Sequence, residues 1–213
     1  MQECVAELVA LTSQEGFAYW RAQGTMWQGW LLSAQGEYAP GIAQMLQGLT
    51  ARQATGASPY RASHFALLAW AHGEAGQVED GLRVVAEALA GADSTGDRAH
   101  AAELYRLKGE LLVQQHPSDP SQAEGCFQQA LAIARGQQAK SLELRAAVSL
   151  SRLWQQQGQS PAAYKKLAGV YGRFTEGFDT ADLQEAKALL EALSSGGTGH
   201  RASLGVARMA NWG

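Results

Sequence analysis

The sequence predicts an all-α solenoid built from four similar helical hairpins, and three observations carry this prediction. Glycines and prolines punctuate the chain, and the segments between them have a helical period with almost no β-branched alternation. The phrase GEYAPGIAQMLQGL at 36–49 returns as GQVEDGLRVVAEAL at 76–89, and in weaker form at 122–131 and 158–171. A hairpin that cannot bury its apolar face alone is stabilised by stacking on the next copy, so a fixed period of this size indicates a solenoid.

The first expected element is a lone amphipathic helix at residues 3–13, the second helix of a repeat whose first half is missing. It is expected to cover the apolar face of the first hairpin. Four hairpins follow, at residues 17–56, 57–96, 97–138 and 139–176. Each is expected to contain two helices joined by a short turn.

The second helix of each hairpin carries the strongest signal, a face that is small, then large, then small. Positions four and then three residues apart stack along one side of a helix with about 3.6 residues per turn. The face consists of Gly41, Met45 and Gly48 in the first hairpin, then Gly81, Val85 and Ala88, then Ala123, Phe127 and Ala130, and finally Ala163, Leu167 and Val170.

The first helix of each hairpin has its own repeated small residue, which allows a close approach between helices. These residues are Gly29, Ala69, Gly109 and Ser151. The turn between the two helices is marked by glycines at which a left-handed C-cap is expected, namely Gly36, Gly76 and Gly158. In the third hairpin the proline pair of HPSDPSQAE takes this place and accounts for two extra residues.

The C-terminal part of the chain differs from the repeats. Residues 179–194 are expected to form a capping helix with Thr180 or Asp179 as N-cap. The tail at 195–213 loses the period and gains glycine, so we expect it to be flexible. From the start inside the repeat register and the non-periodic tail we expect either a fragment of a longer protein or a remnant gene.

The pattern resembles the tetratricopeptide (TPR) repeat, which has a small residue at its eighth position and A-x-x-x-F-x-x-A on its second helix. The closest copy is Ala123, Phe127 and Ala130. The period of 40 exceeds the roughly 34 residues of that family, glycine replaces alanine in the first two copies, and no proline ends the second helix. The resemblance implies one right-handed, TPR-like superhelix over residues 1–194.

The third and fourth hairpins resemble more specifically the helical repeats that end large bacterial signalling ATPases, some of which also carry a nucleotide-cyclase domain. The similar segments are AELYRLKGELLVQQ (102–115), AEGCFQQALAIAR (123–135), KSLELRAA (140–147) and GFDTADLQEAKALLEAL (177–193). The resemblance covers most of residues 15–194 and implies a sensing or docking arm. The chain itself contains no GxxxxGK[ST] phosphate loop, so the ATPase is not part of it.

The resemblance also implies a concave groove lined by the first helices. One inward column is expected at Trp30, Trp70, Glu110 and Arg152, and a second, four residues earlier, at Met26, Ala66, Arg106 and Val148, with Arg145 beside it. The groove is then aromatic toward the N-terminal half and charged toward the C-terminal half. Tryptophan and arginine often carry binding energy at interfaces, and arginine grips a carboxylate in a fork.

Two alternatives stay open for these groove residues. Trp30 and Trp70 could be core residues, as Trp27 and Trp154 are expected to be. Arg106 could instead form a solvated pair with Glu103 or Glu110 on its own helix, which stabilises a helix by only about 0.2–0.5 kcal/mol.

Composition argues against several other classes of protein. A formal net charge of −3 and a pI near 6.0 supply no basic surface for nucleic acid. No apolar run approaches the roughly 18 residues that span a bilayer, and the start has no basic region typical of a signal peptide. Cys4 and Cys126 have no CxxC spacing and fit reduced thiols. We therefore expect a cytoplasmic protein that contacts neither nucleic acid nor membrane.

No catalytic residue, metal site or cofactor is predicted. The five histidines never pair at i and i+4, and no HExxH, CxxC or acidic cluster supplies three metal ligands. Ser149 and Ser151 lie outside any GxSxG sequence. His72 replaces Leu32 and Leu112 on the first helix, so we expect it to pack with a satisfied ring nitrogen.

These observations favour a non-catalytic module that binds a protein or peptide, such as an ATPase or cyclase domain, in its groove. The alternative is a small-molecule sensor, in which an apolar ligand is lined by Met26, Trp30, Leu31 and Trp70. An enzyme is the third hypothesis, and the sequence displays no polar groups that converge on a pocket.

Overall fold

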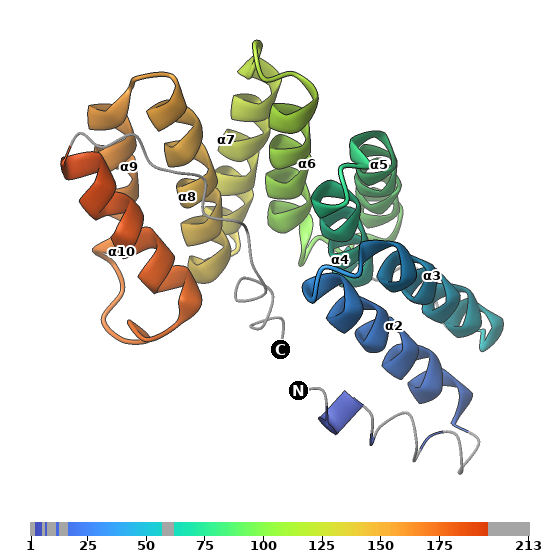
Figure 1. The fold of residues 1–213 in the computed structure, drawn as a ribbon. Helices are drawn as coiled ribbons and strands as arrows, with labels where there is room; N and C mark the ends of the chain where they lie inside the picture. Colours follow the sequence, from blue (N-terminus) through green and yellow to red (C-terminus); the bar gives the residue numbers. More distant parts are fainter. Residues whose placement is uncertain (1–2, 6, 8–11, 13–16, 57–61, 196–213) are drawn as a thin grey trace. The chain divides into compact units, whose positions relative to one another are not determined.

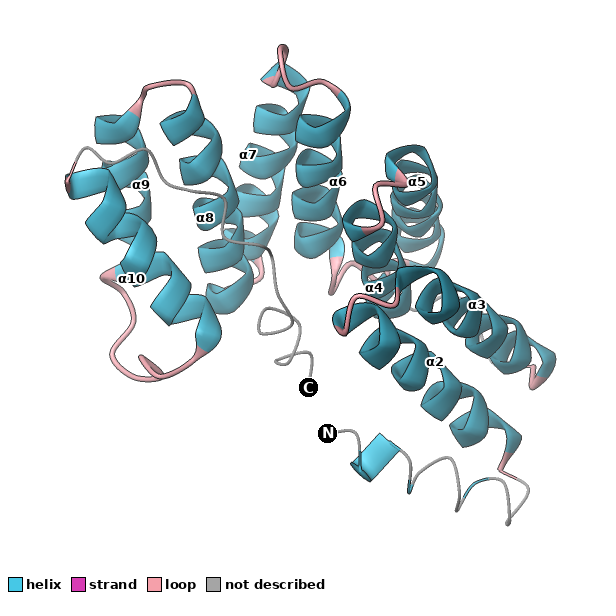
Figure 2. Ribbon diagram, in the orientation of Figure 1, coloured by secondary structure: helices cyan, strands magenta, loops and turns pink. Residues whose placement is uncertain are grey.

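The fold is helical wherever the structure describes it. The structure is a computed structural model that describes residues 3–5, 7, 12, 17–56 and 62–195. In these residues all regular secondary structure is helix and no strand is present (Figure 2), so the predicted all-α class is confirmed. The helix expected at 3–13 lies largely outside the described residues, and the tail expected at 195–213 lies outside them from residue 196 onward.

The chain divides into two units, which we describe separately. Unit 1 is Met1–Arg98 and unit 2 is Ala99–Gly213. The described helices of unit 1 are α2 (Ala18–Ala34), α3 (Tyr38–Ala54), α4 (Ala62–Glu74) and α5 (Val78–Thr95). Those of unit 2 are α6 (Ala101–Gln115), α7 (Ser121–Gly136), α8 (Lys140–Gln156), α9 (Ser160–Tyr171) and α10 (Ala181–Ser194).

Consecutive helices pack as pairs, as Figure 1 shows. In unit 1, α2 packs on α3 and α4 on α5, and α4 also contacts both helices of the first pair. In unit 2, α6 packs on α7 and α8 on α9, and α8 also contacts α6 and α7. Each pair lies within one of the four ranges predicted for a hairpin.

The helix predicted at 179–194 is present as α10, and it packs against α8 and α9. Thr180 is its N-cap residue, as expected, with extended backbone at φ −71° and ψ 147°. Asp182 in the first turn places negative charge near the positive end of the helix dipole, where it is favourable.

Glycine occupies the turns of three helix pairs for a conformational reason. Gly36, Gly76 and Gly158 have φ angles of 90°, 73° and 75°, which confirms the expected left-handed conformation. A Cβ atom at any of the three would meet no heavy atom within 4 Å, so backbone conformation rather than crowding favours glycine there.

The small, large, small face is the packed face of each second helix. All four bulky members, Met45, Val85, Phe127 and Leu167, are almost fully buried, and the small residues on either side of them are buried too. In the first pair the two backbones touch, because a Cβ atom added to Gly29 would lie 2.6 Å from the carbonyl oxygen of Gly41. Small residues therefore set how closely the paired helices approach.

Candidate partner-binding surface

The predicted groove residues of unit 1 are buried rather than exposed. Met26 and Trp30 each expose 1% of their surface and Trp70 exposes 8%. Met26 and Gly29 lie on the side of α2 that faces the glycines of α3, and Trp30 adjoins them. This corrects the expected groove in unit 1, because none of the three side chains presents a free face to a partner. Trp27, expected in the core, is only half-buried and meets Trp30 edge to face at 5.7 Å.

The predicted groove residues of unit 2 form a buried charge cluster. Arg106 donates to both carboxylate oxygens of Glu103, at 2.9 and 2.6 Å, and pairs with Glu110 at 2.5 Å. Ser149 on α8 donates to Glu110 at 2.9 Å. The alternative in which Arg106 pairs on its own helix is therefore correct, but the pair is buried where a solvated pair was expected.

Mutual neutralisation keeps this cluster charged. Burial alone would raise the pKa of the Glu103 carboxyl, but the neighbouring Arg106 guanidinium outweighs it and holds that pKa below its ordinary value. For Arg106, burial opposes the charged form, yet Glu103 and Glu110 raise the pKa of its guanidinium. The cluster is thus an ion network on α6 that is hydrogen-bonded to α8 through Ser149.

The remaining predicted arginines pair with α10. Arg145 donates to Asp182 at 2.7 Å, and both side chains are buried. Arg152 pairs with Glu185 at 2.6 Å and is partly exposed. Both forks therefore already hold a carboxylate of the same unit, so these arginines connect α8 to α10.

A third carboxylate of unit 2 is held by two arginines that the sequence did not single out. Glu143 pairs with Arg135 at 2.6 Å and with Arg173 at 2.5 Å. Burial opposes its ionisation, but the hydrogen bonds from the two arginines lower the pKa of its carboxyl. The two arginines lie eight residues before and thirty residues after Glu143, so local sequence alone did not reveal the pairing.

The exposed apolar side chains lie elsewhere. They are Phe17, Trp20 and Leu46 in unit 1, and Tyr164 and Phe178 in unit 2. Phe17 is the N-cap residue of α2 and Trp20 lies in its first turn, and each is more than half exposed. Tyr19 meets Trp20 edge to face at 5.2 Å. We call Phe17, Tyr19 and Trp20 the aromatic end of α2.

The aromatic end of α2 also has a cation beside it. The guanidinium carbon of Arg52, in the last turn of α3, lies 5.6 Å from the centre of the Tyr19 ring. Sequence reasoning missed this surface because it looked for inward columns. The available signal was that Phe17 and Trp20 lie away from the packed positions 22, 26 and 29 of α2.

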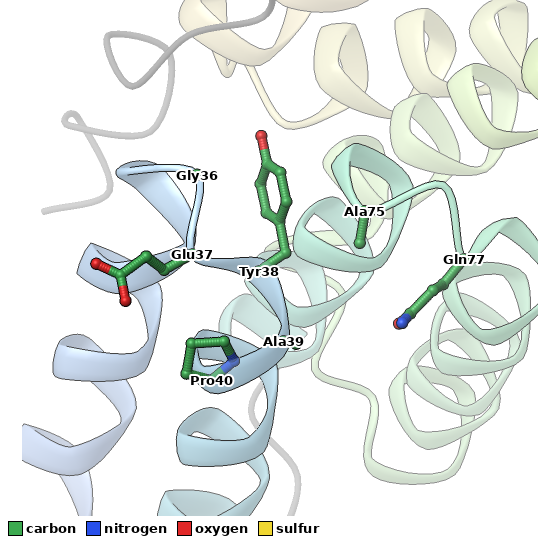
Figure 3. A pocket seen from close by; sticks show the side chains of 7 residues that line it. All are labelled: Gly36, Glu37, Tyr38, Ala39, Pro40, Ala75 and Gln77. Atoms are coloured by element: carbon green, nitrogen blue, oxygen red, sulfur yellow. The ribbon is translucent and has the colours of Figure 1, made fainter.

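Unit 1 also has an open depression between two helix turns, shown in Figure 3. Residues 36–40 line it on one side, and Ala75 and Gln77 line it on the other. Its lining offers one carboxylate, Glu37, and one amide, Gln77. Gln77 already contacts the ring of His72 through an Oε1 to Nδ1 distance of 2.8 Å, which confirms that the buried His72 packs with a satisfied nitrogen.

In the described residues no metal-ligand cluster is present, and the surroundings of Cys126 do not activate its thiol. Among them, no group of three or more His, Cys, Asp or Glu side chains is placed to hold a metal ion. Burial raises the pKa of the Cys126 thiol, which disfavours the reactive thiolate. No helix in the described part of the chain is both long and apolar enough to cross a membrane.

Comparisons with known proteins do not supply a family. No protein-family model matches the chain, and no curated protein matches it.

Proposed function

We propose that this chain is a non-catalytic protein–protein interaction module, the sensing or docking arm of a bacterial signalling or transcription-regulatory system. We further propose that its helix pairs are repeats of a right-handed TPR-like solenoid with a period of about 40 residues. One observation supports the repeat: equivalent positions of all four second helices, such as Met45, Val85, Phe127 and Leu167, are buried in the same way. Modules of this kind bind proteins through surfaces assembled from successive repeats.

The aromatic end of α2 is the best-supported contact surface for a partner. Neighbouring exposed aromatic side chains are unfavourable in water, and tryptophan contributes more often than most residues to binding energy at interfaces. Phe17 and Trp20 are both more than half exposed and lie three residues apart in the sequence, and Trp20 supplies the tryptophan. The residues first assigned to a groove are packed or ion-paired within their own units, so we propose that they contribute to folding stability rather than to partner binding.

A pair of tryptophan substitutions tests this proposal. We expect Trp20→Ala to reduce capture of a partner from lysate of the source organism at least tenfold, the effect of losing about 1.4 kcal/mol, with the unfolding curve unchanged. Trp30→Ala is the matched control, and it is expected to lower the free energy of unfolding by about 3–5 kcal/mol because the side chain is buried.

The two possible failures of this test have different meanings. If Trp20→Ala captures as much partner as the parent chain, the aromatic end of α2 is not the contact surface. If the parent chain captures no protein saturably, the proposed function is wrong. Capture of an ATPase or cyclase domain would identify the signalling system.

The small-molecule hypothesis has no comparable support. Met26 and Trp30 were expected to line an apolar ligand, but both side chains are buried by packing within the protein. The depression in Figure 3 is lined by other residues, and few of them are apolar and bulky.

A further inference from the structure

Arg52 is a buried cation without an acidic neighbour. It exposes only 4% of its surface, and within the described residues its Nε and Nη1 atoms have no hydrogen-bond partner. No described carboxylate lies within ion-pair distance of it, whereas in unit 2 Arg106 pairs with two carboxylates and Arg145 with one. Burying an unpaired charge is unfavourable, so such a group is a candidate for pairing with a ligand.

The fold does not require arginine at this position. Arg52 continues the packed face of α3, eleven residues after Gly41, and the same position of the next two second helices holds Ala92 and Ala134. Both alanines are buried. The second and third hairpins therefore fill this buried position with a methyl group. Only the first of the three hairpins places a guanidinium there.

The local charges also favour an anion at this end of the hairpin. Between residues 17 and 56 the only acid is Glu37, which lies in the turn at the opposite end of both helices. The cations, Arg21 and Arg52, lie in the first turn of α2 and the last turn of α3. Because α2 and α3 are antiparallel, these two turns are at the same end of the hairpin as Phe17 and Trp20.

We propose that this end of the α2–α3 hairpin binds an acidic segment of a partner protein, whose carboxylate pairs with Arg52 while an adjacent apolar side chain packs on Phe17 and Trp20. A single guanidinium fork matches the two oxygens of a carboxylate. The exposed aromatic rings match an apolar neighbour in a polypeptide, and a free phosphate would leave them in water. Binding requires the Arg52 side chain to become accessible at the hairpin end.

This inference rests on the proposed function and narrows it to one kind of partner. The test begins with selection of random linear peptides on the full chain, followed by synthesis of the best binder and of a copy with each acid replaced by its amide. We expect the selected peptides to carry Asp or Glu beside an aromatic or aliphatic residue. The amide copy should bind at least about tenfold more weakly, because charge-assisted hydrogen bonds are lost.

Substitutions in the protein make the test specific. Arg52→Met should weaken binding of the acidic peptide at least about tenfold. Arg52→Lys should weaken it less, because lysine keeps the positive charge but lacks the guanidinium fork. Arg52→Ala places in the first hairpin the residue that the next two hold, so it serves as a second variant expected to fold. Arg83→Met is the matched control in unit 1, since Arg83 is exposed and pairs with Asp80. Circular dichroism and thermal unfolding check that each variant is folded.

Five results would overturn the inference. Selected peptides that lack acids, or that bind Arg52→Met as well as the parent, would reject it and leave the proposed function standing. Inorganic phosphate that competes at the same concentration as the acidic peptide would indicate a general anion site. A shift of the Arg52 Nε–H resonance on Glu15→Gln, without peptide, would show that the chain supplies its own carboxylate. Failure to select any peptide or capture any partner would reject the proposed function as well.

Discussion

The two units bury arginine in opposite ways. In unit 2, Arg106 is enclosed with Glu103 and Glu110, and its donors are directed at their oxygens. In unit 1, Arg52 is equally buried and faces an aromatic ring with no described carboxylate nearby. Burial alone therefore does not show whether a charged group serves stability. The partners decide, because a paired ion contributes to packing and an unpaired one opposes folding until a ligand binds.

The two helices within a pair also approach each other differently in α2–α3 of unit 1 and α6–α7 of unit 2. In unit 1 the backbones of α2 and α3 meet through Gly29, Gly41 and Gly48. In unit 2, Gly109 instead makes room for a ring, because a Cβ atom there would lie 2.5 Å from the Phe127 side chain. Glycine at equivalent positions of two hairpins, Gly29 and Gly109, thus allows backbone contact in one pair and aromatic packing in the other.

The largest expected effect comes from removing the paired cation. Arg106→Met should lower the free energy of unfolding of unit 2 by about 3–5 kcal/mol, since Glu103 is then buried with an uncompensated charge. Arg52→Met should change the stability of unit 1 by less than about 1 kcal/mol or increase it, because no described ion pair is lost. Hydrogen exchange measured by mass spectrometry assigns each effect to its unit. Equal destabilisation by the two substitutions would remove the distinction between the arginines.

A smaller effect is expected from one added methyl group. Gly29→Ala should destabilise unit 1 by about 1–3 kcal/mol, because its Cβ would overlap the backbone of α3. Gly125→Ala in α7 is the matched control: a Cβ there meets no heavy atom within 4 Å, so the higher helix propensity should stabilise by about 0.5–1 kcal/mol. Urea denaturation measures both, and a stabilising Gly29→Ala would contradict the close approach of α2 and α3.

The charge cluster also predicts a response to acid in unit 2. The folded-state pKa of Glu103 lies below its ordinary value of 4.5. Its contribution to stability is therefore complete above about pH 4.5 and is lost as the pH falls through the lower folded-state pKa. Arg106 does not titrate in this window, because its pKa is raised.

Unfolding of Glu103→Gln followed from pH 5 to about pH 2 tests this response. The variant should be less stable than the parent near neutral pH and should lose less stability on acidification. It keeps the share that comes from Glu143, whose pKa is also lowered. If the parent and the variant have parallel pH profiles, Glu103 does not contribute through its charge.

The smallest effect is expected at the exposed pair in unit 1. Arg83 and Asp80 lie 2.6 Å apart, with most of the Arg83 side chain in water. Arg83→Ala should change stability by no more than about 0.5 kcal/mol, because solvent screens the pair and ordering the side chains opposes it. Thermal unfolding at low and high salt checks this, and a loss comparable to that of Arg106→Met would show that exposure does not separate the two pairs.

The sequence by itself determined the helical class, the helix pairs, the left-handed glycine turns and the buried face of each second helix. These features depend on local backbone conformation and on the spacing of apolar residues, and both can be read from the amino-acid sequence. The left-handed turn at Gly36 depends only on the φ angle of that residue. The buried position of Met45 follows from its spacing from Gly41 and Gly48 along α3.

Only the tertiary structure decided how each first helix is rotated and which charges meet. Trp27 and Trp30 differ by about 60° around α2, so a small rotation exchanges a buried ring for a half-buried one. Arg145 finds Asp182 thirty-seven residues away on α10, while Arg52 finds no described acid. Such pairings depend on neighbours that are distant in the chain, and periodicity within one helix carries no information about them.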